Sequence, residues 1–382
     1  MKTSSSKLSA ALAMIGLFAS IPNLHAQESE ARIVAFDVPG AGTGAYQGTG
    51  CFGCTFSINT SGTVVGTYVD ANNVYHGFLR APGGTVTTFE APGANTTLYG
   101  TMAQSINDAG LVTGAYYDAN GVGHGFLRTA EGVFTSFDAP GAVNGTTPLY
   151  INRNGDVVGY ALDVNLLFHA FQRLADGKIL VFVGPGSCTS GTPAGCYGNE
   201  ASYIDPFGFA VGNFEDDSVN LVGHGMIRNP DGRITVFNAP QAGSGAGQGT
   251  GCPGCNFGVN RWGAIAGTYT DANYVTHGFL RGPEGKFITI DAPGAGTGVY
   301  QGTGCPSDCP VDLNDSGVLT GSYYDANYVQ HGFARSPSGA LVSFDPPGSA
   351  GTQPESINNA GTIVGYYQDS TGAYHGFLRV SD

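Results

Sequence analysis

The best candidates for catalytic residues in this sequence are three consecutive acids, Glu215, Asp216 and Asp217. Paired carboxylates cleave glycosidic bonds, one as acid and the other as base or nucleophile. The acids lie in the stretch NFEDDSVN, where a solvated acidic turn is the simpler explanation. No G-x-S-x-G, H-E-x-x-H or P-loop motif occurs in the chain, so we assign no catalytic residue.

Short turns in which tyrosine precedes aspartate form a second candidate site. Tyrosine rings stack on sugar C–H faces, and carboxylate oxygens accept hydrogen bonds from sugar hydroxyls. The structural alternative is that Asp forms the turn while Tyr ends a strand. Calcium is also a candidate at these turns, although no complete D-x-[DN]-x-[DN]-G loop occurs, so we assign no metal or other cofactor. The candidate ligand-binding residues are Tyr68, Asp70, Tyr117, Asp118, Tyr269, Asp271, Tyr324, Asp325, Tyr367 and Asp369.

The eight cysteines form four local pairs, which in an exported chain predicts disulfides. In C-P-G-C, Pro and Gly suit the centre of a type II turn, which brings the end residues within bridging distance. The predicted pairs are Cys51–Cys54, Cys188–Cys196, Cys252–Cys255 and Cys305–Cys309.

The first cysteine pair lies in QGTGCFGC, residues 47–54, which also matches G-x-G-x-x-G. A dinucleotide site would need a surrounding βαβ unit, and a reactive dithiol would need a helix N-terminus. A zinc site shared with Cys252 and Cys255 would have no nearby histidine. We therefore expect the motif to be a stapled surface loop.

The N-terminus and the charge balance limit the compartment and the partners. Lys2 and Lys7 precede a short apolar run, so residues 1–26 are predicted to be a signal peptide and the mature chain to be secreted, extracellular or periplasmic. No later run is long enough to span a membrane. Without residues 1–26 the chain has 13 basic and 29 acidic residues, which argues against nucleic acid as a partner.

Internal repetition dominates the rest of the sequence. The phrase SINDAGLVTGAYYDANGVGHGFLR (105–128) returns as SINNAGTIVGYYQDSTGAYHGFLR (356–379). The 62 glycines disfavour helices, and the short alternating segments rich in Val, Thr, Tyr and Phe indicate strands. One histidine marks each repeat of about 45–55 residues, at positions 76, 124, 169, 224, 277, 331 and 375.

Four strands fit each repeat, which predicts an all-β, seven-bladed β-propeller as a single domain over residues 27–382. The mature chain begins with an outer strand, RIVAFDVPG (32–40), and ends after a third strand, HGFLRVSD (375–382). The N-terminal strand would therefore complete the last blade and close the ring, which protects sheet edges. A β-solenoid is the alternative, but it does not explain the complementary half-repeats.

The repeats resemble those of the secreted bacterial HAF extracellular repeat proteins, whose units read I-N-x-x-G-x-V-V-G followed by H-A-F-L. The literal H-A-F stands at residues 169–171, and H-G-F replaces it in five other repeats. The resemblance covers about residues 32–382 and implies an exported repeat scaffold without an established common activity.

The phrase H-G-F-L-R places His, Phe and Arg on one face of a packed strand. We expect these seven copies to form a structural hydrogen-bonding and stacking set. Acids that follow the outer strands are the expected partners of the arginines. These acids are Asp37, Glu90, Asp138, Asp291 and Asp345.

Together these features predict a non-catalytic, monomeric binding scaffold for an extracellular carbohydrate or a cell-surface protein. A glycan hydrolase or lyase using the Glu215 turn and a purely structural surface protein are the alternatives.

Overall fold

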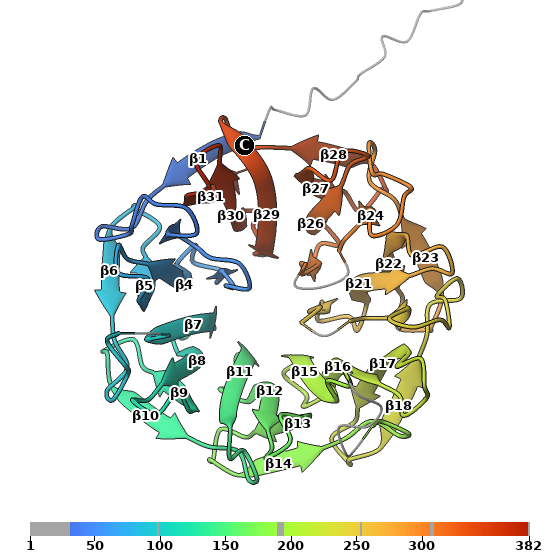
Figure 1. Ribbon diagram of the computed structural model, residues 1–382, viewed down its shortest axis with the longest axis horizontal. Helices are drawn as coiled ribbons and strands as arrows, with labels where there is room; N and C mark the ends of the chain where they lie inside the picture. The colour runs from blue at the N-terminus through green and yellow to red at the C-terminus, as the bar shows by residue number, and fades with distance from the viewer. Residues whose placement is uncertain (1–30, 98, 189–194, 253, 306–308, 381–382) are drawn as a thin grey trace, which may run out of the picture.

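The computed structural model describes residues 31–97, 99–188, 195–252, 254–305 and 309–380. All regular elements in these ranges are β-strands, grouped into antiparallel units around a common axis (Figure 1). No helix there is long and apolar enough to cross a membrane. The predicted signal peptide, residues 1–26, lies outside the described residues.

The first strand of each unit lies nearest the axis. In three units it is split into two short pieces that pair with the same second strand, because a cysteine-containing loop interrupts it. The inner strands are β2 (Gly48–Thr49) with β3 (Ser57–Ile58), β7 (Thr101–Ile106), β11 (Gly145–Ile151), β15 (Asn199–Ile204), β19 (Gly249–Thr250) with β20 (Gly258–Val259), β24 (Gly302–Thr303) with β25 (Asp312–Leu313), and β29 (Ser349–Ile357).

The second and third strands form the buried middle of each unit. The second strands are β4 (Val64–Val69), β8 (Val112–Tyr117), β12 (Val157–Leu162), β16 (Ala210–Glu215), β21 (Ile265–Thr270), β26 (Leu319–Tyr324) and β30 (Ile363–Asp369). The third strands are β5 (Tyr75–Arg80), β9 (Gly123–Arg128), β13 (Phe168–Arg173), β17 (Gly223–Arg228), β22 (Thr276–Arg281), β27 (Gln330–Arg335) and β31 (Tyr374–Val380).

Short fourth strands form the outer rim (Figure 1). The fourth strand paired with β31 is β1, from the start of the chain, with Arg32 opposite Val380 and Phe36 opposite Gly376. The outer strands are β1 (Arg32–Phe36), β6 (Val86–Phe89), β10 (Phe134–Phe137), β14 (Ile179–Phe182), β18 (Ile234–Phe237), β23 (Phe287–Ile290) and β28 (Leu341–Phe344).

The hydrophobic core lies between neighbouring units. Phe56 and Phe78 of the first repeat pack with Val364, Tyr366 and Leu378 of the last one. Comparable clusters of buried side chains fill the spaces between the other neighbours. Each sheet is therefore stabilised by burying both of its faces.

Asparagines in the N-x-x-G turns link neighbouring units near the axis. Asn59 Nδ2 donates to the carbonyl of Asn107, and Asn107 Nδ2 donates to the carbonyl of Asn152. Asn358 Nδ2 donates to the carbonyl of Asn59 at 3.1 Å, joining the last repeat to the first. Asp205 replaces Asn in one repeat and still closes its turn by accepting from the backbone N–H of Phe207 and Phe209.

Candidate functional site

One face of the molecule, here called the Cys-loop face, carries the loops that enter each inner strand and the turns between second and third strands. Backbone hydrogen bonds hold the two sets together, for example Gly42 N–H to Val69 and Gly296 N–H to Tyr324. The predicted cysteine loops and Tyr–Asp turns are therefore neighbours on this face.

A single aspartate organises each turn on the Cys-loop face. Asp70 Oδ1 accepts from the backbone N–H of Asn72 (2.8 Å) and Val74 (2.9 Å). Burial raises the pKa of Asp70, but these hydrogen bonds outweigh it and leave the pKa below its usual value. At Asp369 the Thr371 hydroxyl is the main donor, and the pKa falls to about 2. The geometry explains these acids as turn formers, and their sugar-binding role stays a prediction.

The tyrosines of the predicted turn sites fall into two positions. Tyr68, Tyr269 and Tyr367 are buried and stack on the repeat histidine, with ring centroids 4.8–5.0 Å apart. Tyr117 and Tyr324 stand one position later along the strand and are half-buried. Their preceding tyrosines, 116 and 323, are the ones that stack on histidine.

The acids at the ends of the outer strands bind histidine. His277 Nδ1 lies 2.7 Å from Asp291, while its Nε2 faces Asp271 at 3.7 Å. The hydrogen bond to Asp291 raises the pKa of His277 despite its burial, and the one to Glu90 does the same for His76. Similar bonds join histidine to the other predicted acids, Asp37, Asp138 and Asp345. The expectation that these five acids pair with arginine is therefore wrong.

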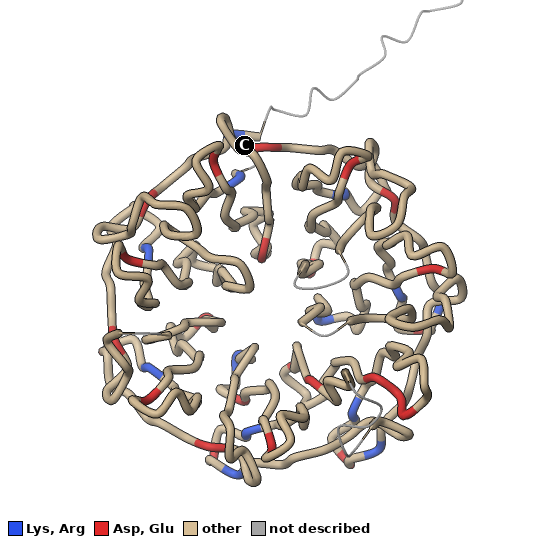
Figure 2. The backbone as a smooth tube through the Cα atoms, viewed as in Figure 1, with Lys and Arg blue, Asp and Glu red and all other residues tan. Residues whose placement is uncertain are grey.

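Six of the seven repeat arginines stack on an aromatic ring, because the outer strand of the neighbouring unit ends in phenylalanine. Figure 2 shows basic residues recurring between the inner and outer strands. Arg80, for example, lies 5.0 Å from the ring centroid of Phe36 in β1. At Arg335 the corresponding outer-strand residue is Ile290, and no such stack occurs among the described residues. The same contact is made by Arg128 on Phe89, Arg173 on Phe137, Arg228 on Phe182, Arg281 on Phe237 and Arg379 on Phe344.

All four predicted cysteine pairs are joined as disulfides. Their Cα–Cα distances are 5.1 Å for Cys51–Cys54, 6.5 Å for Cys188–Cys196, 5.0 Å for Cys252–Cys255 and 5.5 Å for Cys305–Cys309. The C-x-x-C segments form turns, since Cys54 N–H donates to Cys51 O. Pro253 of C-P-G-C lies outside the described residues.

The first glycine of each QGTG segment lies where the backbones of two neighbouring units meet. A Cβ at Gly48 would lie 2.1 Å from the carbonyl oxygen of Tyr374, and one at Gly302 would lie 2.0 Å from that of Thr276. Gly48 has a φ of +123° and Gly302 a φ of +114°, and this backbone conformation favours glycine. The approach of two backbones thus explains the first glycine of the G-x-G-x-x-G pattern, whereas a Cβ at Gly50 would meet the side chain of Tyr366 and one at Gly53 would meet nothing within 4 Å.

An open cavity of about 310 Å³ lies on the Cys-loop face between the fourth and fifth units. We call it the Tyr197–Tyr300 cavity after the two tyrosines that line it, which are 51% and 48% exposed. Tyr300 and Leu221 have positive φ angles of 59° and 51°. Equivalent residues of other units, such as Tyr46 and Tyr274, have the same conformation, which therefore belongs to the repeat. The lining of this cavity includes the side chains of Tyr197, Asn213, Glu215, Leu221, Gln248 and Tyr300.

Glu215 brings a carboxylate into this cavity. It ends β16 and accepts from the backbone N–H of Tyr197 at 2.8 Å. Burial and the charge of Asp216 raise the pKa of Glu215 although that hydrogen bond opposes them. The corresponding positions in the other units hold Val69, Tyr117, Leu162, Thr270, Tyr324 and Gln368, so the carboxylate is particular to this unit.

The three consecutive acids have different surroundings. Asp216 Oδ1 accepts from Ser218 and Val222, and its Oδ2 lies 3.3 Å from His224 Nε2. Asp217 is exposed. Glu215 alone of the three lines the Tyr197–Tyr300 cavity.

In the described ranges, one group of three His, Cys, Asp or Glu side chains is close enough to hold a metal ion. It consists of Cys188, Cys196 and Glu215. The two sulfurs are joined in a disulfide, so they do not supply thiolate ligands.

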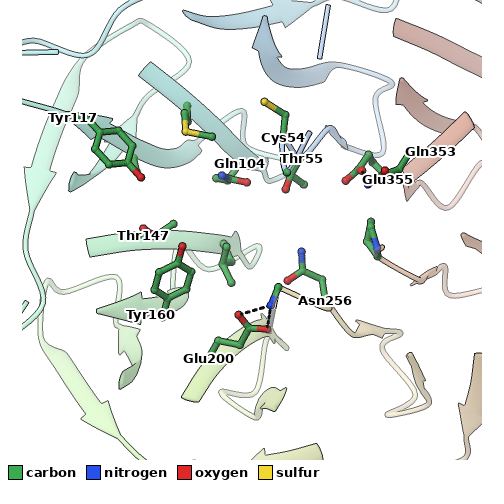
Figure 3. A pocket seen from close by; sticks show the side chains of 16 residues that line it. Cys54, Thr55, Gln104, Tyr117, Thr147, Tyr160, Glu200, Asn256, Gln353 and Glu355 are labelled. Atoms are coloured by element: carbon green, nitrogen blue, oxygen red, sulfur yellow. Dashed lines mark hydrogen bonds between the residues drawn. The ribbon is translucent and has the colours of Figure 1, made fainter. Parts of the chain in front are cut away.

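A second cavity, here called the axial cavity, lies where the inner strands converge. Figure 3 shows side chains from several units directed toward it. Its polar lining includes Gln104, Glu200, Asn256, Gln353 and Glu355. Glu200 accepts from Asn213 Nδ2 at 2.8 Å and from the backbone of Gly254, whereas Glu355 accepts from Gln353 Nε2 at 2.8 Å.

Solved structures with this fold are β-propellers. The β-propeller domain of the Trilobed protease from Pyrococcus furiosus aligns with a TM-score of 0.56 at 10% identity, covering 86% of this chain and 96% of that one. The BP39L lectin from Burkholderia pseudomallei aligns with a TM-score of 0.52 at 9% identity, covering 86% and 95%. No protein-family model and no curated protein matches the sequence. The prediction of an all-β propeller scaffold is confirmed, and the HAF resemblance stays a prediction.

Sequence reasoning missed the polar residues of the axial cavity. The signal lies three residues before the turn-forming Asn or Asp, where Gln104, Leu149, Ser202 and Glu355 differ although the surrounding phrase is constant. A polar residue that varies in an otherwise constant buried strand indicates a special environment near the axis.

Proposed function

We propose that this protein is a secreted, single-domain binding scaffold, a closed propeller of seven blades over residues 27–382, whose Cys-loop face binds an extracellular carbohydrate. Antiparallel pairing of β1 with β31 and the bond from Asn358 to Asn59 support the closed ring. The four disulfides fit an oxidising compartment outside the cytoplasm.

The Tyr197–Tyr300 cavity is the observation that carries this proposal. Two exposed rings provide stacking surfaces, while Glu215, Asn213 and Gln248 provide polar groups within the same cavity. A concave site of roughly 300 Å³ or more with aromatic walls and a few polar groups is typical of a small-ligand pocket. Sugar rings match that combination because they have C–H faces and hydroxyl edges.

The rigidity of the surrounding structure favours binding. Tyr300 is held by its backbone N–H donating to Tyr274 O at 2.7 Å and by an edge contact between the two rings at 5.9 Å. A preorganised ring loses little conformational entropy when a ligand stacks on it.

Binding of the mature protein to a polysaccharide array, followed by titration of the best saccharide, tests this function. Tyr300→Ala should weaken binding about tenfold, which corresponds to about 1.4 kcal/mol. Tyr46→Ala is the matched control, because Tyr46 is an exposed tyrosine in the equivalent loop of the first unit, outside the lining of this cavity. No saturable saccharide binding, or equal losses in both variants, would contradict the proposal.

The same saccharide-binding measurement tests the predicted turn residues. Changing Tyr117 with Asp118, or Tyr324 with Asp325, should reduce saccharide binding if the turns contribute to recognition. Unchanged binding in both double variants, with a loss in Tyr300→Ala, would restrict the site to the Tyr197–Tyr300 cavity.

Glycan cleavage is the second candidate function, because the pKa of Glu215 is raised as a general acid requires. A second carboxylate is needed at a distance set by the mechanism. Turnover of the bound saccharide that is lost in Glu215→Gln, with binding retained, would establish the enzyme. Binding without turnover in the native protein would establish the scaffold.

A further inference from the structure

The Cys-loop face, which carries the proposed saccharide site, has neither Lys nor Arg among the described residues. The seven repeat arginines end the third strands, which begin at the Cys-loop face and run away from it. The other six basic residues also lie toward the opposite face, at the start of β1, in N-x-x-G turns or in the turns that precede outer strands. These six are Arg32, Arg153, Lys178, Arg233, Arg261 and Lys286.

Acids, in contrast, recur all around the Cys-loop face. Each of the seven turns between second and third strands contains an aspartate, and an acid follows the outer strand in five units. Each repeat histidine lies within 3.8 Å of a turn aspartate, so a protonated histidine there is paired with an acid. A surface with charge of one sign attracts ligands of the opposite sign and repels those of the same sign.

Glu215 brings this negative charge into the Tyr197–Tyr300 cavity. Its side chain accepts from the backbone N–H of Tyr197 at 2.8 Å, and the sulfurs of Cys188 and Cys196 lie within 4.8 Å of one of its oxygens. The disulfide has no hydrogen to donate, and none of the described residues lining the cavity is Lys, Arg or His. The backbone N–H stabilises the carboxylate but has no net charge, so the remaining lone pairs can bind a cationic donor.

We propose that the saccharide bound in the Tyr197–Tyr300 cavity carries a protonated amine, whose ammonium group pairs with Glu215. This inference rests on the proposed saccharide binding and names the class of sugar. Hydrogen bonds between an ammonium and a carboxylate are about twice as strong as those between neutral groups. The faces of tyrosine rings also attract cations. A sugar with a carboxylate or sulfate group would instead be repelled by Glu215 and by the acids of the Cys-loop face.

Three oligosaccharides of one length test this preference for charge. Tetramers of glucosamine, glucose and glucuronic acid with the same β-linkage differ in one substituent per ring, which makes them cationic, neutral and anionic. Calorimetric titration of the mature protein at low salt and about pH 6, where such an amine is protonated, compares their affinities. The glucosamine tetramer should bind about tenfold or more tighter than the glucose tetramer. The glucuronic acid tetramer should show no saturable binding.

Glu215→Gln identifies the group that selects the amine. Glutamine keeps an acceptor for the backbone N–H of Tyr197 but has no charge, so the preference for glucosamine should fall to about twofold or less. Binding of the glucose tetramer should persist, which also shows that the variant is folded. Asp217→Asn is the matched control, because it removes the same charge from an exposed neighbour that does not line the cavity. The preference should be kept in this variant.

A salt titration of the native protein provides a test without any variant. Added salt should weaken binding of the glucosamine tetramer and leave that of the glucose tetramer unchanged, because salt screens the attraction between charges. Equal salt dependence of the two tetramers would contradict the ion pair.

A preference for the amine that is lost in Glu215→Gln and kept in Asp217→Asn supports the pairing. Saturable binding confined to neutral or anionic saccharides, among the tetramers or on the polysaccharide array, overturns this inference and leaves the proposed saccharide binding intact. A preference that persists in Glu215→Gln overturns it as well. Absence of binding to every saccharide removes the proposed function itself, so the two failures are distinguishable.

Discussion

Five of the seven repeat histidines lie between an aromatic ring of their own unit and two carboxylates, one at each ring nitrogen. Among the described residues, His169 has one carboxylate neighbour, Asp163, and His224 has Asp216 and the amide of Asn238. His277 stacks on Tyr269 with centroids 5.0 Å apart, and its two ring nitrogens face Asp291 and Asp271. A neutral imidazole has one N–H donor, whereas the protonated ring donates to both acids. At His76 and His277 the hydrogen bonds to Glu90 and Asp291 favour the charged ring and raise the pKa, although burial opposes this.

These shifts predict a decline of stability on the alkaline side. A histidine with a raised pKa in the folded state stabilises the fold fully below about pH 6.5, and this contribution is lost as the pH rises through the raised pKa. The free energy of unfolding, measured by urea titration from pH 5 to 9, should fall above about pH 6.5.

Asp291→Asn tests the cause, because it removes the carboxylate that raises the pKa of His277. The alkaline decline should be shallower in this variant and unchanged in Asp217→Asn, an exposed acid. Equal pH profiles in native protein and Asp291→Asn would show that the pair does not control stability.

At the scale of the elements, the loops that enter the inner strands depend on glycines at which two units touch. Gly302 pairs in parallel with Thr276 of the preceding unit, and Gly48 pairs with Tyr374 in the same way. These single bridges join separate antiparallel units into larger sheets. The disulfide loops that follow are thereby attached to a rigid edge, which suits a binding face.

Gly302→Ala should lower the free energy of unfolding by more than about 3 kcal/mol. A methyl group there would meet a backbone oxygen at 2.0 Å in addition to the backbone strain of positive φ. Gly141→Ala is the control, since Gly141 has φ +84° but nothing within 4 Å of an added Cβ, so about 1–2 kcal/mol is expected. Chemical denaturation measures both values, and similar losses would contradict the close-contact explanation.

At the scale of the whole molecule, the two ends of the chain share one sheet. The five residues of β1 pair with β31, and Phe36 packs on Phe78 of the first repeat and under Arg80. The first strand thus contributes to the last unit and also to the interface with the first.

Removing β1 should therefore destabilise the protein more than its length suggests. A mature chain that begins at Val38 should unfold at least 10 °C lower and self-associate, because β31 would become an exposed edge. A chain that begins at Arg32 is the control and should behave like the native protein. Thermal unfolding and size-exclusion chromatography measure both effects, and a monomeric chain of native Tm after deletion would exclude closure by β1.

Local features that recur at fixed spacing follow from the order of the amino acids alone. Strand register, turn-forming Asp and Asn, cysteine pairs and the all-β propeller class could be predicted, because each depends on residues a few positions apart or on the repeat itself. The two tyrosine positions, one that stacks on histidine and one a residue later, were also visible in the sequence, since Tyr116 and Tyr117 are adjacent.

Which repeats meet, and which side chains lie between them, depends on the three-dimensional arrangement of the units. The acids after the outer strands bind His277 and its counterparts rather than arginine, because strand pairing brings them to the third strand of the same unit. Glu215 and Tyr300 line one cavity, and Gln104 and Asn256 line another, only because units that are far apart in sequence are arranged around one axis. Side-chain convergence of this kind depends on the rotation between units, which no local spacing encodes.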